Sequence, residues 1–345
     1  MSVTGILELT RQRHGFIRAP GLGAREDDVY VSASQVRRCE LRSGDEVTGP
    51  ARKARRGERH RALVHVDTVN GGPPQEEGRV DFDSLTPVAA SRRIALGAEA
   101  GTLARGADLL APLAYGQRAL VRAAPRSGRT TLLRELATAL AETEGTRVIA
   151  LLIDERPEEL PGWHAVSEAL ELALAPADLA PREQVRVAEL AVDRVRRLAE
   201  SGVDAVLLCD SLSRLAVAAE GAAEVKRLFG SGRDLAEDGA GSLTVIATVF
   251  ADGEDEGSAS RAVSTTETSL VTLDESLAEE GIVPALRFAD CRVVGEESLL
   301  AERELEGLRH LRAKLRDMVS PEAAAYLRER IEASASNQAL LEDLA

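Results

Sequence analysis

Aromatic side chains are scarce in this sequence, since Phe, Tyr and Trp make up only 3% of its 345 residues. The hydrophobic cores must therefore be filled mainly by Leu, Val and Ala. Cysteine is rare as well, and the three copies (Cys39, Cys209 and Cys291) show no CxxC or Cys/His spacing. That pattern supports neither a disulfide framework nor a zinc site.

Long apolar runs are also missing. No stretch of about 18 apolar residues occurs, so the sequence predicts no transmembrane span. The first residues, MSVTGILELTRQRH, lack the basic-then-apolar order of a signal peptide. We therefore expect a cytoplasmic protein without a membrane partner, and the length of the chain predicts more than one domain.

Charge is distributed unevenly along the chain. The formal net charge is −14, yet residues 1–70 hold 13 Lys and Arg against 9 Asp and Glu, a balance of +4. The rest of the chain therefore carries −18. A basic N-terminal part in an acidic protein points either to an anionic partner at that end or simply to a charged, solvated surface.

Hydrophobic periodicity divides the chain into two parts. Residues 3–70 show short alternating segments separated by turn residues, typical of a small all-β unit such as a five-stranded barrel. From residue 118 onward, apolar strands alternate with helical stretches, which predicts a mainly parallel sheet with helices on both faces. We expect a small domain over 1–70, a linker and entry segment over 71–115, and an α/β domain over 116–345 with a helical C-terminal segment.

The segment APRSGRTT (124–131) has the features of a phosphate-binding loop between a strand and a helix. Gly128 permits a sharp turn, and the Thr130 hydroxyl is placed to reach Mg²⁺. The pattern is missed at Ala123 and Arg129, where it has glycine and lysine, so a plain strand-to-helix connection is the alternative. The residues predicted to bind nucleotide are Pro125, Arg126, Ser127, Gly128, Arg129, Thr130 and Thr131.

Two other apolar strands end in carboxylates. DAVLLCD ends in Asp210, and a second apolar strand ends in the motif IDERPEE with Asp154 and Glu155. Because the carboxyl ends of parallel strands line one crevice, these groups should converge on the loop. We predict that Asp210 and Thr130 hold the Mg²⁺ of bound ATP and that Glu155 activates the attacking water. Without the loop, each acidic residue would more simply be a helix cap.

Several longer segments resemble the bacterial transcription termination factor Rho family. They are HGFIRAP, DDVYVSASQVRRCELRSGDEVTG, LLIDERPEEL, DAVLLCDSLSRLA and GAGSLTVIAT. The resemblance implies a RecA-like P-loop ATPase core, mainly a parallel sheet, preceded by a small OB/cold-shock-like domain. It also implies a homo-hexamer that uses ATP and Mg²⁺, binds nascent single-stranded RNA and acts on RNA polymerase. Many family members carry a helical piece before the barrel; a truncation and a mistaken start site are the two explanations for a sequence that begins directly with the barrel segments.

The resemblance assigns RNA binding to His14, Phe16, Arg18 and Tyr30. Exposed rings would stack on bases for roughly 1–3 kcal/mol per base, while Arg18 would hold phosphate. The family has two aromatic residues where this chain has His14 and Phe16, so we expect weaker capture. The alternative for Phe16 is a core position, and the basic run 52–61 either adds phosphate contacts or forms a solvated hairpin tip.

This chain departs from the family at its motor residues. Arg129, assigned a catalytic role with Glu155 and Asp210, replaces a lysine, and a forked guanidinium is no simple substitute for an ammonium. Gly281 stands at the position of the arginine finger and Glu275 at that of a second arginine. Such a finger is worth roughly 10³–10⁵ in turnover in related enzymes. We therefore expect hydrolysis to be impaired.

The loops that would grip RNA in the ring are altered as well. Only residues 222–225 separate SRLAVAAEG from KRLFG, where the family carries a longer Gly-rich insertion. The second loop reads ADGEDEGSAS (251–260), and its acidic residues would repel phosphate if they faced RNA, or would simply form a solvated turn.

Two functions are compatible with these patterns. The first is a Rho-like terminator with RNA-dependent ATPase and translocase activity that is weakened in this chain. The second is a catalytically impaired Rho paralogue that serves as an RNA-binding or regulatory subunit, including in a mixed ring with an intact homologue. The motor substitutions favour the second mechanism. A RecA-like ATPase of another process is a third reading, which the RNA-binding pattern disfavours.

Overall fold

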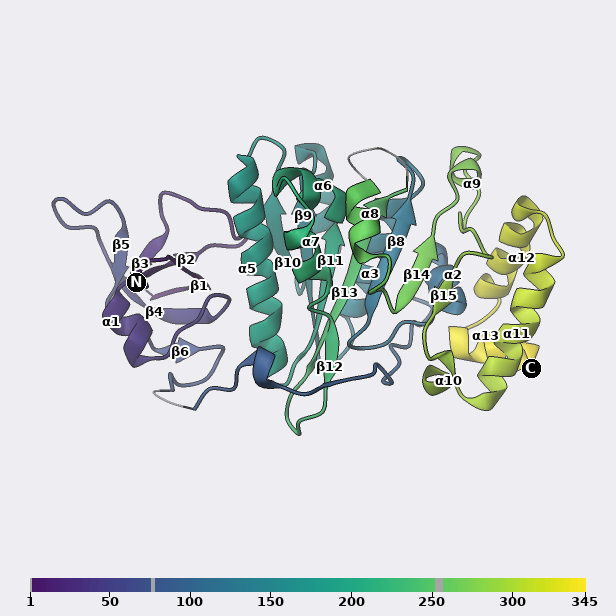
Figure 1. Cartoon of the computed structure of the whole chain (residues 1–345), viewed down its shortest axis with the longest axis horizontal. Coiled ribbons are helices and arrows are strands. Elements are labelled where there is room, and N and C mark those ends of the chain that lie inside the picture. The colour runs from purple at the N-terminus through teal and green to yellow at the C-terminus, as the bar shows by residue number, and fades with distance from the viewer. Residues whose placement is uncertain (1, 76–77, 252–256) are drawn as a thin grey trace.

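The computed structural model describes residues 2–75, 78–251 and 257–345, and its parts follow one another along an elongated molecule. A small barrel forms one end, a nine-stranded sheet with helices on both faces forms the middle, and a group of helices forms the other end (Figure 1). This arrangement confirms the predicted fold class of an α/β core preceded by a small all-β unit. In the described part of the chain, no helix is both long and apolar enough to cross a bilayer.

The barrel is a six-stranded sheet with the order β1-β2-β3-β5-β4-β6, closed by pairing of β1 with β4. Its strands are β1 (Ser2–Leu9), β2 (Gly15–Arg18), β3 (Val29–Val31), β4 (Glu46–Arg52), β5 (Arg61–Leu63) and β6 (Thr68–Val69). Helix α1 (Ala33–Arg38) follows β3 and begins with a capping box at Ser32. The sequence predicts one strand over 61–69, but the chain leaves the ladder after Leu63 and returns at Thr68, so six strands form instead of five.

The large sheet has the order β10-β9-β11-β13-β8-β14-β15, and β12 and β7 extend it at one corner. Strands β10, β9, β11, β13, β8 and β14 pair in parallel, as their apolar composition predicts. The strand bounds are β7 (Pro87–Val88), β8 (Arg118–Ala123), β9 (Thr146–Ile153), β10 (Glu171–Ala175), β11 (Asp204–Asp210), β12 (Arg233–Leu235), β13 (Ser242–Phe250), β14 (Ser269–Thr272) and β15 (Arg292–Val293).

Alternate residues of these strands serve two separate cores. On one face, Val121, Leu152 and Leu208 pack with α2 and α3; on the other, Leu151 and Leu207 pack with α5, α6 and α7. Figure 1 shows α5 to α8 in front of the sheet and α2 and α3 behind it. The bounds of the helices around the sheet are α2 (Thr102–Leu110), α3 (Arg129–Ala141), α4 (Leu160–His164), α5 (Pro181–Glu200), α6 (Leu212–Ala218), α7 (Ala223–Phe229), α8 (Gly257–Val263) and α9 (Glu275–Glu279), with 3₁₀ turns η1 (Phe82–Ser84) and η2 (Pro157–Glu159).

The C-terminal segment is helical, as predicted, and is anchored to α2. The buried Arg105 guanidinium donates to Asn337 Oδ1 (3.0 Å) and to the Ile331 carbonyl (2.8 Å). The second bond satisfies a carbonyl at the end of one C-terminal helix, and the first holds the side chain of the residue that begins the next helix. The helices are α10 (Glu296–Leu299), α11 (Glu302–Arg316), α12 (Ser320–Glu332) and α13 (Asn337–Leu344).

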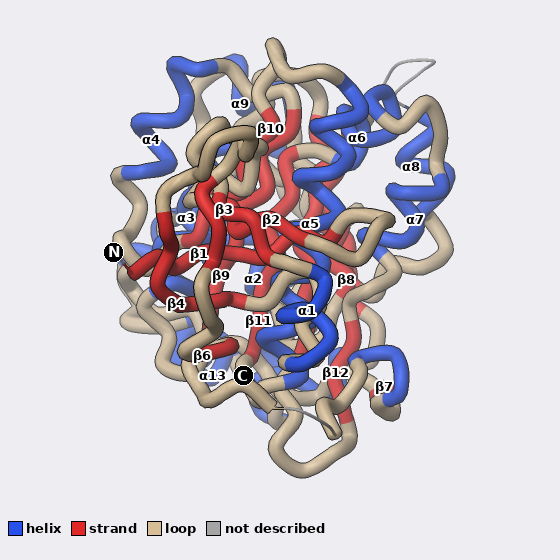
Figure 2. The backbone as a smooth tube through the Cα atoms, turned by 90° about the vertical axis from the view of Figure 1, so that its left-hand side faces the viewer, coloured by secondary structure: helices blue, strands red, loops and turns tan. Residues whose placement is uncertain are grey.

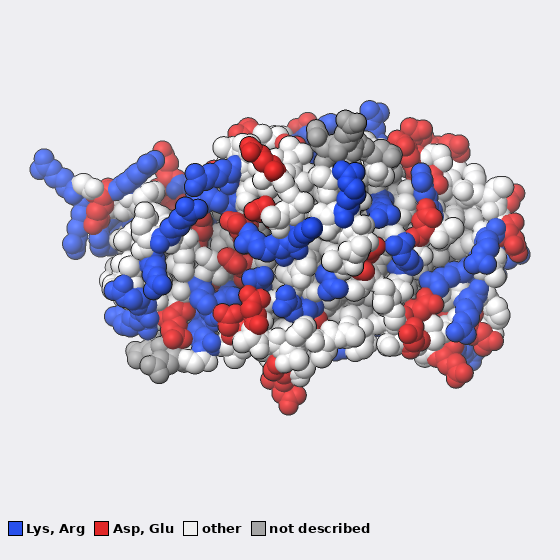
Figure 3. Space-filling view, viewed as in Figure 1, with Lys and Arg blue, Asp and Glu red and all other residues white. Residues whose placement is uncertain are grey.

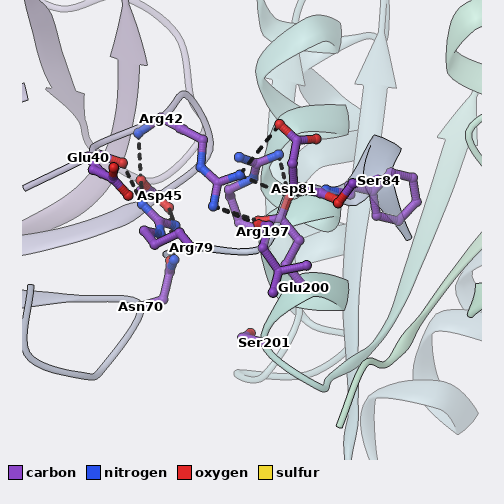
Figure 4. Close-up of polar contacts among 12 residues, drawn as sticks. Glu40, Arg42, Asp45, Asn70, Arg79, Asp81, Ser84, Arg197, Glu200 and Ser201 are labelled. Carbon is purple, nitrogen blue, oxygen red and sulfur yellow. Dashed lines mark hydrogen bonds and ion pairs between the residues drawn. The ribbon is translucent and has the colours of Figure 1, made fainter. Parts of the chain in front are cut away.

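The barrel docks on helix α5 and on edge strand β10, in front of the sheet when the molecule is viewed from its barrel end (Figure 2). Gly44 packs so closely that a Cβ there would lie 2.3 Å from the Asp193 carbonyl carbon. Figure 4 shows the polar part of this junction. Arg79, from the linker, forms a bidentate pair with the buried Asp45 of the barrel (2.7 and 2.5 Å), and Arg42 reaches Glu200 on α5 (3.3 Å).

Candidate RNA-binding face and nucleotide site

Four rings from separate segments meet on one face of the barrel. Phe16 on β2 stands opposite Tyr30 on β3, and their ring centroids are 5.9 Å apart. His14 lies 5.3 Å from Tyr30, and His60, from the turn before β5, lies 5.1 Å from Phe16. All four side chains are half-buried, so part of each ring faces solvent. Phe16 is thus a member of a surface cluster and lies outside the barrel core formed around Leu7 and Val31.

Arg18 lies beneath this ring cluster and is already paired. Its guanidinium contacts Glu8 (Nε to Oε2, 2.7 Å) and the buried Asp28, and its Cζ is 5.4 Å from the centre of the Phe16 ring. Only 5% of the residue is exposed. The structure therefore groups Arg18 with the predicted rings, but with its charge offset by two carboxylates. Phosphate contact by Arg18 stays a prediction.

A cleft of about 500 Å³ opens beside Tyr30 and His60. Arg38 and Arg59 are exposed cations on its wall, and Arg52 and Glu58 form a bidentate pair there (2.6 and 2.8 Å). The hydrogen bonds from Arg52 and from the Arg55 amide lower the pKa of Glu58 to about 2. Figure 3 shows Lys and Arg side chains gathered over the barrel on this view. The cleft thus combines ring edges, positive charge and one fixed carboxylate.

The predicted phosphate loop connects β8 to α3. Gly128 has φ +94 and begins the helix without a side-chain cap, so the first-turn amides of α3 are free to meet an anion. Ser127 is buried, and its hydroxyl donates to the Ala124 carbonyl (2.8 Å), which fixes the turn. Pro125, Arg126 and Thr131 are exposed around the loop.

Arg129 folds back from the helix onto Asp210. Its Nε lies 2.9 Å from Asp210 Oδ1, and its Cζ lies 4.3 Å from the centre of the Phe250 ring. Asp210, at the end of β11, is completely buried and also accepts from the Thr248 hydroxyl (3.2 Å). The Thr130 hydroxyl approaches Asp210 Oδ2 at 3.4 Å. The predicted residues Thr130, Arg129 and Asp210 are therefore brought together.

Glu155 lies at the end of the neighbouring strand and is held by Arg214. Arg214 Nη1 donates to Glu155 Oε2 (3.0 Å) and to the Ile153 carbonyl (3.1 Å), and only 5% of Glu155 is exposed. The Arg214 guanidinium also lies 6.0 Å from the centre of the Phe250 ring, which Arg129 covers more closely. Phe250 thus sits between the two arginine–carboxylate pairs.

The residues around Asp210 do not fit a divalent metal ion in this arrangement. Mg²⁺ prefers oxygen ligands in an octahedral shell, usually with several waters. Here the cation beside Asp210 is the Arg129 guanidinium, which carries no lone pair for a metal. Within the described ranges, no group of three or more His, Cys, Asp or Glu gathers into a metal site. The predicted role of Thr130 and Asp210 toward Mg²⁺ stays a prediction.

The comparisons with known proteins agree with this combination of a barrel and a P-loop core. A profile described as Rho termination factor, RNA-binding domain, matches residues 3–75. Transcription termination factor Rho of Chromobacterium violaceum is 36% identical over 99% of this chain and 87% of its own length. The protein of that name from Bacillus subtilis is 35% identical over 97% of this chain and 82% of its own. The chain belongs to the transcription termination factor Rho family.

A solved structure extends the likeness to the core fold. An ATPase from the type III secretion system of pathogenic bacteria matches with a TM-score of 0.63 and 19% identity, covering 82% of this chain and 94% of that chain. Identity at this level shows the fold alone. It confirms the predicted RecA-like architecture.

Gly281, the residue predicted to stand at the arginine-finger position, has a local structural role. Gly281 follows helix α9 with φ +70, its amide donates to Ala278 O (3.0 Å), and the next amide, of Ile282, donates to Leu277 O (2.8 Å). This is a glycine-terminated helix end, a conformation in which a side chain is strained. No atom lies within 4 Å of where a Cβ would be. Glu275 is the first residue of the same helix.

Three contributors to these sites are missed by the sequence pattern. His60 lies in the basic run 52–61, Arg214 lies in the quoted DSLSRLA motif, and Phe250 ends strand β13. The sequence shows that each residue is present, but its role depends on contacts with residues far away in the chain. Of the acidic loop 251–260, residues 252–256 lie outside the described residues.

Proposed function

We propose that this Rho-family chain captures single-stranded RNA on its barrel and binds nucleotide at its P-loop, with ATP hydrolysis weakened. The observation that carries the RNA part is the cluster of four half-buried rings around Phe16 and Tyr30, next to a cleft with exposed cations. Aromatic rings stack on the flat faces of exposed bases. Single strands can expose these faces, whereas the bases of paired strands are already stacked within the duplex. Its relatives are named for transcription termination, and we extend that process to this chain.

The pairing of each arginine on this face determines which of them can contact phosphate. Arg18 is neutralised by Glu8 and Asp28, so it supports the Phe16 ring from below. The exposed Arg38 and Arg59 are the cations available to phosphate. RNA binding therefore gains stacking from the rings and a salt-dependent contribution from the cleft wall.

The nucleotide site supports binding better than turnover. The free amides at the start of α3 suit the phosphates, and Glu155, oriented by Arg214, is the group we assign to the attacking water. The transition state also needs positive charge from a neighbouring subunit. Gly281 and Glu275 supply none. We therefore favour an impaired paralogue that works as an RNA-binding or regulatory subunit, in a hexamer of its own or in a ring with an intact homologue, against RNA polymerase.

The RNA assignment is tested by fluorescence anisotropy with single-stranded and double-stranded RNA. Wild type should prefer the single strand. Phe16→Leu, which keeps apolar bulk but removes the ring, should weaken binding about 5- to 150-fold, the equivalent of roughly 1–3 kcal/mol of lost stacking. Phe16→Tyr is the matched control and should bind nearly as wild type. Equal affinity of the Leu and Tyr variants would contradict stacking.

The assignment of a weak motor is tested by RNA-stimulated phosphate release. We expect wild-type turnover well below roughly 1 per second, the low end of ordinary enzymes. Turnover at or above that rate would establish an active Rho-type motor instead. Mass measurement with and without RNA in the same samples separates a ring from a lower oligomer.

A further inference from the structure

Arg129 is held in place by contacts that have nothing to do with a phosphate. Its Nε faces Asp210 Oδ1 at 2.9 Å, its guanidinium covers the Phe250 ring at 4.3 Å, and only 12% of its side chain is exposed. A salt bridge and a cation–π contact on the same planar group restrain both its position and its orientation. The side chain is therefore part of the floor of the nucleotide site.

Asp210 depends on this contact. Its carboxylate is completely buried, and apart from Arg129 its described neighbours at Oδ1 and Oδ2 are two neutral hydroxyls, those of Thr248 and Thr130. A buried carboxylate is stable only when a cation or several donors compensate its charge. The guanidinium supplies that compensation within the chain itself.

A divalent ion at Asp210 would have to displace the guanidinium. Two cations within a few ångströms repel each other strongly in a site of low polarity. Moving Arg129 away would also break its contact with the Phe250 ring. Arg214 is the other arginine near that ring, but its guanidinium is already hydrogen-bonded to Glu155. The site therefore favours its internal cation over an external one.

We propose that Arg129 takes the place of the divalent metal, so that the chain binds nucleoside di- and triphosphates as the metal-free anion. This inference rests on the proposed nucleotide binding. The phosphates would meet the amides at the start of α3 and the guanidinium of Arg129, which faces Asp210 through Nε as an ion pair without hydrogen-bond geometry and carries further N–H donors in the same plane. A guanidinium offers several donors in a plane and suits phosphate oxygens without a metal between them.

The test is a binding titration of the full chain with ATP and ADP by calorimetry, in excess MgCl₂ and in excess EDTA. We expect dissociation constants in the two buffers that agree within about threefold, or tighter binding in EDTA. In Arg129→Lys, the shorter and more compact cation should release Asp210, and binding should weaken about tenfold or more in EDTA, as expected for loss of one ionic contact. Arg147→Lys, at an exposed position paired with Glu171, is the matched control and should behave as wild type.

A spectroscopic readout keeps the test independent of the variant. Mn²⁺ titrated into the wild-type complex with ADP should give no protein-bound signal in electron paramagnetic resonance beyond that of Mn²⁺–ADP in solution, while the Arg129→Lys complex should give one. Wild-type binding that requires Mg²⁺, or a bound Mn²⁺ signal in wild type, would overturn the metal-free site while leaving nucleotide binding intact. Failure to bind in both buffers would refute nucleotide binding itself, and this inference with it.

Discussion

Placing an arginine at position 281, the predicted finger position, tests the proposed loss of turnover most directly. Gly281→Arg places a long cation at the end of α9, where no atom lies within 4 Å of the new Cβ. The backbone there has φ +70, so the side chain costs roughly 1–2 kcal/mol of local strain. In a domain of this size that cost should lower the melting temperature by about 2–8 °C. The fold should therefore survive the change.

The expected gain in turnover far exceeds that cost. A finger contributes roughly 10³–10⁵ where it has been measured in related NTPases. Combined with Arg129→Lys, which restores the family cation of the loop, Gly281→Arg should raise RNA-stimulated phosphate release at least about 100-fold over the Arg129→Lys variant alone. We set the expectation below that range because the segments predicted to grip RNA, including the short 222–225 connection, remain as they are.

The chain contains a matched control for strain and charge. Gly295 has φ +73 and is equally open, so Gly295→Arg introduces the same residue under the same backbone strain at a different place. It should lower stability similarly and leave turnover unchanged. Because a finger acts on the neighbouring subunit, Arg129→Lys subunits should gain activity when they are mixed with subunits that carry Gly281→Arg and Glu155→Gln together, which are inactive on their own. Turnover of the double variant within about threefold of its parent, with RNA binding intact, would refute the finger argument.

Three further predictions concern stability and RNA binding. Burial raises the pKa of Asp193 from its ordinary 3.8 to about 6, so the folded state binds this proton more tightly than the unfolded state does. The stability that the proton contributes at low pH is lost as the pH rises through about 4 to 6. In urea unfolding, the stability of Asp193→Asn relative to wild type should therefore increase by about 1–3 kcal/mol between pH 4 and 7. Gly44→Ala, whose Cβ would lie 2.3 Å from the Asp193 carbonyl carbon, should loosen the barrel and increase proteolysis of the linker, whereas Gly57→Ala at an equally positive φ in open space should not. RNA affinity should fall with salt, and Arg59→Gln should reduce that salt slope by about 1 if its cation contacts phosphate.

Sequence periodicity predicts the centre of the fold closely. The strand expected before the phosphate loop is β8, and the apolar strand DAVLLCD is β11. These are continuous apolar runs buried on both faces, so pattern and tertiary environment require the same residues. The barrel is harder, because the run 61–69 looks uniform in sequence but is divided between β5 and β6, which pair with different parts of the same strand, β4.

The site shows where sequence reasoning stops. The phosphate loop, Asp210 and Glu155 are recognisable in the sequence because each lies at or just after the end of an apolar strand. The destination of a long side chain is not, since Arg129 could point to solvent or phosphate and instead lies against Asp210 and Phe250, which are far away in the chain. The place of His60 in the ring cluster is equally hard to predict, because its partner Phe16 is distant in the sequence and close only in the folded barrel.

The two sites differ in what they need from other subunits, and this difference explains how one can be kept while the other is weakened. The ring cluster is complete within a single barrel, because Phe16, Tyr30 and His60 all come from the same small sheet. The P-loop site has its carboxylates and loop in one chain, whereas in the function that we propose the positive charge for hydrolysis comes from a neighbouring subunit. Loss of that charge leaves the barrel, the sheet and their junction unaltered, since Gly281 lies at an open helix end and contacts neither core. A chain of this kind can therefore keep RNA affinity and ring contacts while losing turnover, and the ratio of RNA affinity to ATP turnover is the quantity that distinguishes it from an active motor.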